Sequence, residues 1–265
     1  IEKPIAKGFW AKGGYSYGKA KNTVDPGSIA FGSWNNNQHS GNPNNPGVGL
    51  SSATQGHRVF GSATYRIEYF KFGATSVSAF WETSRGINGS YTFSGDLNGD
   101  GGTSNDLIYI PRDTSEMNFE QFTSSGTTFT VDQQTAAWEA FINQDPYLSK
   151  HRGQYAGRGG AFLPFFTSID FSVAQDFMFN LGNTKHKFQV RADILNFGNF
   201  LNHSWGVGNA FTSLQPLIAR GADANGRALY RLRNFGTNLI SNSYTPTAGT
   251  GDVYRIQIGL RYTFN

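Results

Sequence analysis

Residues 253–264 carry the sequence Val253-Tyr254-Arg255-Ile256-Gln257-Ile258-Gly259-Leu260-Arg261-Tyr262-Thr263-Phe264. Apolar and polar side chains alternate along this stretch, as they do in a β-strand whose two faces meet different surroundings. One face carries Tyr254, Ile256, Ile258, Leu260, Tyr262 and Phe264, and the other carries Arg255, Gln257, Gly259, Arg261 and Thr263. The stretch therefore predicts a strand with one apolar and one polar face.

The same period of two recurs in five further segments. Phe188 to Ile194, Ile169 to Phe177 and Val59 to Tyr69 are clear cases, and Phe9 to Lys19 and Thr75 to Glu82 are weaker ones. The sequence thus predicts an all-β chain with about six antiparallel strands.

The links between these strands differ sharply in length. Two are short turns, at Phe70-Lys71-Phe72-Gly73 and at Asn180-Leu181-Gly182-Asn183, whereas the other three are long and occupy residues 22–57, 87–164 and 198–251. Short and long links alternate, so all the long links should emerge at one end of the sheet. Bacterial outer-membrane β-barrels combine short periplasmic turns with long extracellular loops in this way.

Aromatic residues gather near both ends of the predicted strands, which is typical of the girdles at membrane interfaces. Phe70, Phe72, Phe179 and Phe264 lie near the short turns, and Tyr15, Tyr17, Trp81 and Phe165 lie toward the long links. A soluble sandwich or propeller would explain the alternation, but neither the asymmetric links nor the aromatic ends. We therefore predict a segment of a transmembrane β-barrel.

Composition excludes several other classes of protein. The 265 residues contain no cysteine, so disulfides and thiolate metal sites are ruled out. The net charge of +4 comes from scattered residues without a basic block, so nucleic acid is not an expected partner. No apolar run approaches the roughly 20 residues of a membrane-spanning helix.

One helix is expected, inside the longest loop. Ala137, Trp138, Phe141 and Ile142 fall on one helical stripe, and Thr130 with Gln133 matches a capping box.

Several motifs, in their order and spacing, resemble the C-terminal third of the TonB-dependent transporters of Bacteroidetes, particularly the Oar-like and SusC-like groups. The resemblance covers nearly all of residues 1–265. It rests on His57-Arg58-Val59, Gly95-Asp96-Leu97-Asn98-Gly99-Asp100-Gly101, Asn105-Asp106-Leu107-Ile108-Tyr109-Ile110-Pro111, Arg191-Ala192-Asp193-Ile194-Leu195-Asn196-Phe197-Gly198-Asn199 and Leu201-Asn202-His203-Ser204-Trp205-Gly206.

The resemblance implies a location in the bacterial outer membrane, in contact with its lipid, and a role in energised uptake of a substrate bound at the cell surface. It also implies that the chain is a portion of a plugged barrel of about 22 strands, with the remaining strands and the plug toward the N-terminus. TonB, ExbB and ExbD are implied partners, and the resemblance leaves a surface lipoprotein partner open. Asn265 after Phe264 departs from the family, whose chains usually end on an aromatic residue.

The acidic stretch after Gly95 allows two interpretations. Asp96, Asn98 and Asp100 place oxygen atoms at alternate positions like the first half of an EF-hand, but Leu107 occupies the position of its bidentate glutamate. Together with Asp106 these residues would form a calcium site that fixes an extracellular loop. Its ligands would be Asp96, Asn98, Asp100 and Asp106. Alternatively, these side chains bond to their own backbone in a tight Asx-rich turn.

No catalytic site is expected. Gly14-Tyr15-Ser16-Tyr17-Gly18 matches the nucleophile-elbow pattern, but it lies inside an alternating strand with no helix after it. The five histidines are far apart and show no metal-ligand spacing. Arg152 and Arg158 suit either an anionic substrate or nearby loop carbonyls.

Uptake is thus the leading function. A surface scaffold that binds a protein through its loops is the alternative, and a barrel-embedded hydrolase is the least favoured.

Overall fold

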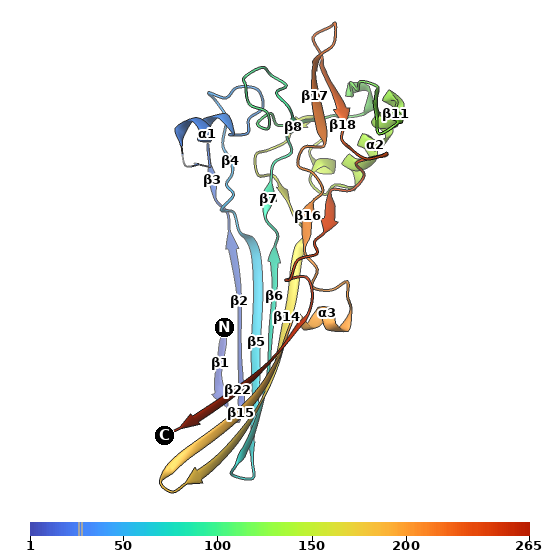
Figure 1. Ribbon diagram of the computed structural model, residues 1–265. Helices are drawn as coiled ribbons and strands as arrows, with labels where there is room; N and C mark the ends of the chain where they lie inside the picture. Colours follow the sequence, from blue (N-terminus) through green and yellow to red (C-terminus); the bar gives the residue numbers. More distant parts are fainter. Residues whose placement is uncertain (26, 28) are drawn as a thin grey trace.

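The computed structural model describes residues 1–25, 27 and 29–265, and it consists of a long β-sheet with a cap of loops at one end (Figure 1). The sheet has seven strands in the order β1-β2-β5-β6-β14-β15-β22. Every neighbouring pair is antiparallel. The strands are β1 (Glu2–Ala6), β2 (Phe9–Gly18), β5 (Gly56–Tyr69), β6 (Gly73–Arg85), β14 (Phe165–Leu181), β15 (Thr184–Leu195) and β22 (Arg255–Phe264).

The predicted all-β class and the six long strands are confirmed, with β1 as an additional edge strand. β14 is longer than the sequence pattern indicated, because its pairing with β6 continues from Phe177 back to Phe165. Among the residues that the structure describes, β1 and β22 form the two edges of the sheet.

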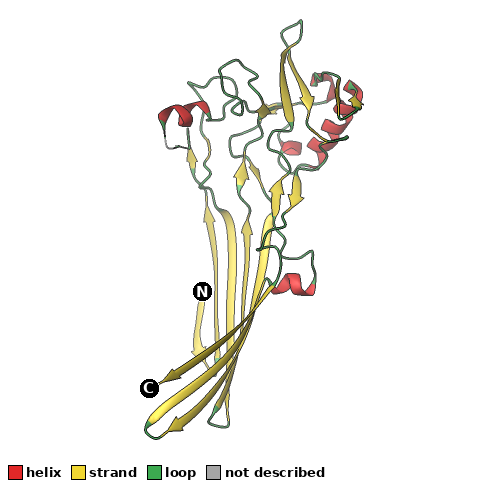
Figure 2. Ribbon diagram, in the orientation of Figure 1, coloured by secondary structure: helices red, strands yellow, loops and turns green. Residues whose placement is uncertain are grey.

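The predicted asymmetry of the links is present. Residues 19–55, 86–164 and 196–254 connect strands at the end that carries the cap, and the tight turns lie at the opposite end (Figure 2). Two short turns were expected, but the structure has a third between β1 and β2, where Lys7 and Gly8 both have positive φ angles, of 50° and 78°. Only five residues before this turn form a strand, and that is too short a segment for alternation to stand out in the sequence.

The strand register places apolar residues opposite one another across six strands. One row, from β2 to β22, consists of Ala11, Ala63, Ala79, Phe171, Ile194 and Ile256. The next consists of Phe9, Tyr65, Val77, Val173, Ala192 and Ile258. We call the surface formed by these two rows the apolar face. Since a slip of one residue would exchange the two faces, the apolar pattern and the register specify each other.

The opposite surface, here called the polar face, carries hydrogen-bonded and charged groups. Its clearest row is Thr64, Ser78, Ser172, Asp193 and Gln257. Nearby, the buried carboxylate of Asp176 accepts hydrogen bonds from Arg66 Nη1 at 2.7 Å and Gln189 Nε2 at 2.7 Å. It also pairs with Lys187 Nζ at 2.9 Å.

The loop cap comprises the three long links and contains short elements. Its strands are β3 (Lys21–Asn22), β4 (Gly49–Leu50), β7 (Asn88–Gly89), β8 (Phe93–Ser94), β9 (Tyr109–Ile110), β10 (Phe122–Ser124), β11 (Thr127–Phe129), β12 (Gln154–Tyr155), β13 (Ala161–Phe162), β16 (Asn209–Phe211), β17 (Leu217–Ala222), β18 (Ala228–Leu232), β19 (Asn234–Phe235), β20 (Asn238–Leu239) and β21 (Tyr244–Pro246). Its helical segments are α1 (Ala30–Asn35), α2 (Val131–Gln144), α3 (Phe197–Leu201) and the 3-10 turns η1 (Thr114–Glu116) and η2 (Leu148–Lys150).

The hydrophobic core of the chain lies in this cap. Its centre is formed by Trp138, Phe141 and Ile142 of α2, all fully buried, which pack with Tyr91, Ile108 and Leu232. The predicted helix and its capping box at Thr130 and Gln133 are confirmed. Helices α1 and α3 were not predicted, because six and five residues are too few for a helical period to emerge.

None of the described helices has the length and apolar character needed to cross a membrane.

Candidate functional site

The acidic loop that follows β8 lies in the cap and is built on turns. Gly95, Gly99 and Gly101 all have positive φ angles, of 95°, 80° and 87°, a backbone region that glycine enters without steric cost. These three positions fold the chain back on itself. The loop thereby brings its carboxylates close to the backbone N–H groups that follow them.

The four predicted calcium ligands have different partners in this loop. Asp96 Oδ1 accepts from Gly99 N–H at 2.7 Å, and its Oδ2 accepts from Gly101 N–H at 2.9 Å. Asn98 Oδ1 accepts from Asp100 N–H at 2.9 Å. Both side chains thus form the Asx-type turn contacts that the sequence offered as the alternative to calcium ligation.

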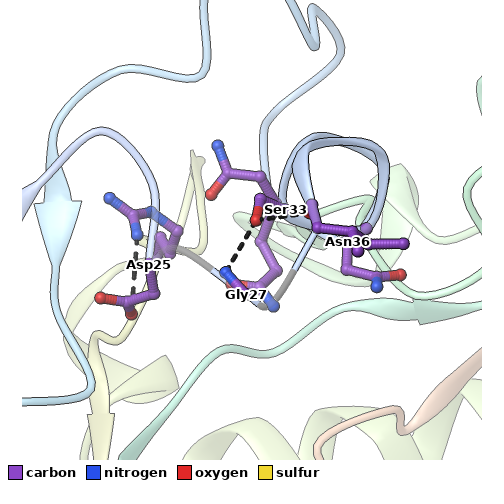
Figure 3. Close-up of a pocket in the computed structure, with 9 residues that line it drawn as sticks. Asp25, Gly27, Ser33 and Asn36 are labelled. Carbon is purple, nitrogen blue, oxygen red and sulfur yellow. Dashed lines mark hydrogen bonds and ion pairs between the residues drawn. The ribbon is translucent and has the colours of Figure 1, made fainter.

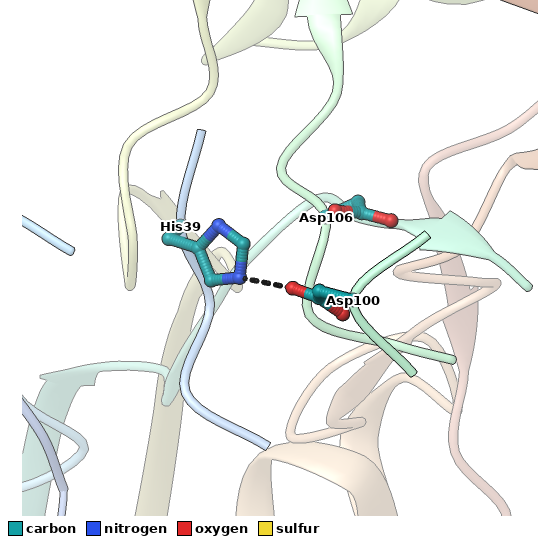
Figure 4. Close-up of side chains that lie close together, drawn as sticks. All are labelled: His39, Asp100 and Asp106. Atoms are coloured by element: carbon teal, nitrogen blue, oxygen red, sulfur yellow. Dashed lines mark hydrogen bonds and ion pairs between the residues drawn. The ribbon is translucent and has the colours of Figure 1, made fainter. Parts of the chain in front are cut away.

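Asp100 and Asp106, in contrast, lie together and meet a histidine from another loop (Figure 4). The link between β2 and β5 brings His39 beside them, and its Nε2 is 2.9 Å from Asp100 Oδ2. The ligand atoms of His39, Asp100 and Asp106 all lie within 4.8 Å of one another. Asn105 completes this group, which we call the His39 cluster: His39, Asp100, Asn105 and Asp106.

The surroundings of the two carboxyl groups in the His39 cluster shift their pKa values in opposite directions. Burial raises the pKa of Asp106 above its usual value, although Leu97 N–H donates to this carboxylate at 2.8 Å. Burial acts in the same direction on Asp100, but hydrogen bonds from Gly102 N–H and the Asn105 amide outweigh it, so the pKa of Asp100 is lowered. The carboxyl group of Asp100 therefore stays ionised to a lower pH than that of Asp106.

Sequence reasoning missed the place of His39 in this site. His39 lies 61 residues before Asp100, and a single parallel bridge between His39 and Asp106 sets its position. The only available signal was a lone histidine in an Asn- and Gly-rich loop, and that pattern is common among surface residues. The site therefore depends on contacts between two long loops.

A polar cavity of about 470 Å³ lies nearby in the cap (Figure 3). Its lining includes Asp25, Ser33, Asn36, Asn37, Gln38 and Arg158. Amide, hydroxyl and charged groups of this kind suit a small, strongly hydrogen-bonding ligand.

Arg158 borders this cavity but is engaged mainly with the protein. Its Nη2 donates to the backbone oxygen of Asn22 and, at 2.8 Å, to Asn22 Oδ1. Its Nη1 is 3.8 Å from Asp25 Oδ2. The Nε and Nη1 atoms are buried and have no hydrogen-bond partner in the described part of the chain.

The remaining residues that the sequence pointed to lie outside the His39 cluster and contact other parts of the protein. Arg152 pairs with Glu139 at 2.6 Å and donates to the Pro111 carbonyl at 3.2 Å, so it holds the loop together. Ser16 lies inside β2 opposite Arg58, in extended backbone that lacks the sharp turn of a nucleophile elbow. His57, His151 and His186 form separate contacts, with Tyr15, the Tyr147 carbonyl and Tyr262 respectively.

Comparison of the chain with protein-family models, with curated proteins and with solved structures finds no match to any of them.

Proposed function

We propose that this chain forms part of the wall and surface loops of an outer-membrane β-barrel, and that this barrel is a TonB-dependent transporter. The observation that carries the first half of the proposal is the apolar face. Its rows continue without a polar interruption across β2, β5, β6, β14, β15 and β22. Its side chains remain accessible: Tyr65 is 48% exposed, Val77 38% and Ile258 73%.

Lipid is the surrounding that best suits this face. Soluble monomers seldom expose a continuous apolar patch of more than a few hundred Å². In a bilayer the same surface is favourable, and the antiparallel pairing satisfies the backbone groups that lipid cannot. Aromatic residues at both ends of the strands, such as Phe70 and Phe72 at one turn and Trp81 and Phe165 near the cap, support two membrane interfaces.

The polar face would then line the barrel interior. Its paired groups, such as Arg58 with Glu82 at 2.7 Å and Arg191 with Asp193 at 2.8 Å, suit a wet or plug-filled lumen. The loop cap would face the outside of the cell, where its polar cavity offers a place for a substrate. The step from barrel to transporter rests on the resemblance of the motifs around Gly95 and Arg191 to the TonB-dependent family.

The membrane assignment is tested by fractionation and extraction. We expect the protein in the outer-membrane fraction, released by detergent but not by high salt or carbonate. A protein that stays monomeric and folded in detergent-free buffer at high concentration would contradict the assignment.

Transport is tested separately, by comparing the compounds removed from the medium by wild-type cells, cells lacking this gene and cells lacking TonB. We expect at least one compound whose removal requires both genes. If all three strains remove the same compounds while the protein still resides in the outer membrane, a surface scaffold that binds a protein through its loops becomes the better explanation.

A further inference from the structure

The His39 cluster joins two loops that are far apart in sequence. The backbone N–H of His39 donates to the Asn105 carbonyl at 2.9 Å, and Leu107 N–H donates to the His39 carbonyl at 2.9 Å. These bonds fix the backbone on both sides of the cluster. The side chains that meet there are therefore held by the fold and are not a chance arrangement at a mobile surface.

Three members of the cluster are buried and the fourth, Asp100, has a side chain that is 13% exposed, and the ligand atoms are spaced for a cation. His39 is 1% exposed, Asn105 2% and Asp106 4%. Burial of the Asp106 carboxyl group this close to the Asp100 carboxylate is costly unless a positive charge lies near them. The ligand atoms of His39, Asp100 and Asp106 all lie within 4.8 Å of one another, so a single ion placed between them could contact all three residues.

The hydrogen bonds of Asn105 provide independent evidence that the cluster lacks a component. Asn105 Nδ2 lies 3.2 Å from His39 Nε2 and 3.1 Å from Asp100 Oδ2, while its buried Oδ1 has no hydrogen-bond partner in the described residues. Gly41 N–H donates to His39 Nδ1 at 3.1 Å, so the proton of the neutral ring is on Nε2. Asn105 Nδ2 and the Nε2–H of His39 therefore both donate to Asp100, and Asn105 Oδ1 is the atom of the cluster left without a partner.

Turning the Asn105 amide over does not satisfy every atom of the cluster. Oδ1 would then accept from His39 Nε2, but it would also face the carboxylate of Asp100, so that two acceptors would oppose each other. A cation between these groups would give the unpaired Asn105 Oδ1 a partner. It would take the lone pairs of Asn105 Oδ1, His39 Nε2 and both carboxylates.

We propose that the His39 cluster binds one divalent transition-metal ion of the Zn²⁺ type through His39 Nε2, Asp100, Asp106 and Asn105 Oδ1. An imidazole nitrogen among the ligands favours zinc over calcium or magnesium, which prefer oxygen atoms alone. This ligand set shares Asp100 and Asp106 with the set predicted from sequence. It replaces Asp96 and Asn98, whose oxygen atoms accept backbone hydrogen bonds, with His39 and Asn105.

Binding requires one proton to move. His39 Nε2 exchanges its proton for the metal, and the ring takes a proton on Nδ1, as a metal-bound histidine generally does. Gly41 N–H then loses its acceptor and must turn away. Gly41 has a φ of 123°, a backbone region that glycine enters without steric cost, and no neighbouring atom lies within 4 Å of the position that a Cβ would occupy.

The ion would act as a cross-link between the two loops. It would hold the link between β2 and β5 against the loop after β8, next to the polar cavity that Asn37 and Gln38 help to line. The proposal concerns the stability of the cap. It does not depend on whether the barrel transports a substrate.

The test is calorimetric titration of the purified, chelator-treated protein in detergent with Zn²⁺ and, separately, with Ca²⁺. We expect a Zn²⁺ site with a stoichiometry of one that is weakened by about 100-fold or more in Asp106→Asn and His39→Gln, because loss of even an outer partner of a ligand costs about 10–100-fold. The glutamine of His39→Gln would still offer an amide N–H to Asp100, so this variant separates metal binding from the hydrogen bond. Titration with Co²⁺ should produce visible absorption bands that His39→Gln lacks.

Two matched variants serve as controls. His203→Gln removes a histidine from an exposed position in the last long loop, and Asp96→Asn alters the acidic loop outside the cluster. Both should bind Zn²⁺ like the wild type. The proposal is overturned if His39→Gln, shown by proteolysis to keep a folded cap, retains wild-type Zn²⁺ affinity, or if the cluster binds Ca²⁺ more tightly than Zn²⁺.

Discussion

Asp176 and Arg66 form an ion pair of 2.7 Å although 110 residues separate them and a whole strand, β6, lies between their own strands. Arg66 reaches across Ser76 of β6, to which its Nη1 also donates at 3.3 Å. Lys187 approaches the same carboxylate from β15. One buried anion thus connects three strands of the polar face.

Replacement of Asp176 by Asn should destabilise the sheet. The change removes the charge shared by Arg66 and Lys187, and hydrogen bonds to charged groups typically contribute about 1.5–3 kcal/mol. We expect a loss of about 2 kcal/mol in the free energy of unfolding, since Arg66 and Lys187 remain partly solvated. Urea unfolding of the protein in lipid vesicles, followed by tryptophan fluorescence, would measure it.

Glu68→Gln is the matched control for this prediction. Glu68 pairs with the same Arg66 at 3.1 Å, but its side chain is 69% exposed. Exposed ion pairs contribute about 0–1 kcal/mol. Equal losses in Asp176→Asn and Glu68→Gln would show that burial of the Asp176 carboxylate does not matter.

The sheet could be predicted from sequence because each of its long strands alternates over many residues. β22 alone shows five apolar side chains on one face, and its neighbour β15 repeats the pattern in register. Tertiary contacts were not needed to see this. β1 escaped prediction because five residues, with Pro4 among them, show no clear alternation.

An arginine on the apolar face should prevent stable insertion into a bilayer, whereas the same residue one position away should be tolerated. We compare Val173→Arg with Ser172→Arg, since Val173 lies in an apolar row and Ser172 lies opposite Asp193 on the polar face. Arginine facing lipid near the bilayer midplane costs about 2–4 kcal/mol. Immunodetection of heat-modifiable, folded protein in the outer membrane should therefore show a strong loss for Val173→Arg only.

A similar loss in Ser172→Arg and Val173→Arg would contradict the assignment of the apolar face to lipid. Arginine at position 172 can pair with Asp193, so a clash of charges is not expected there.

The cap depends on a buried carboxylate that receives four hydrogen bonds. Tyr91 Oη and Ser243 Oγ each donate to Asp145 Oδ2 at 2.6 Å, and the N–H groups of Tyr147 and Leu148 each donate to Oδ1 at 2.8 Å. Burial, followed by the charge of Asp145, raises the pKa of Tyr91 far above its usual range, so its hydroxyl keeps its proton and remains a donor.

Tyr91→Phe should destabilise the cap by about 1–2 kcal/mol, because it removes a single hydrogen bond to a buried charge. Asp145→Ala should cost more, since it leaves two hydroxyls and two backbone N–H groups without an acceptor. Hydrogen exchange of residues 131–150, with exchange in the sheet as internal reference, would measure both. A Tyr91→Phe effect equal to that of Asp145→Ala would contradict the shared network.

The candidate site was predictable only in part, for a physical reason. Asp100 and Asp106 belong to one local loop, so their proximity follows from six residues of sequence. His39 and Asn105 join them through backbone pairing between two loops, and no local sequence pattern predicts that pairing. Asp96 and Asn98 had the spacing of calcium ligands, but Asx turns use the same spacing, so the sequence alone could not separate the two.

The first long link should loosen at acid pH through Asp25. Burial acts to raise the pKa of this carboxyl, but hydrogen bonds from Ser51, Asn22 and Ser52 N–H, together with the charge of Arg158, lower it from 3.8 to about 2. Because the pKa is lower in the folded loop, its stabilisation is present above pH 3.8 and is lost as the pH falls toward about 2. Hydrogen exchange or pepsin cleavage of residues 19–55 should therefore increase steeply over this interval.

In Asp25→Asn the link should be less protected at neutral pH and should lack this part of the acid response, since no carboxylate remains to be protonated. An acid response identical to that of the wild type would show that other carboxyl groups govern the loop.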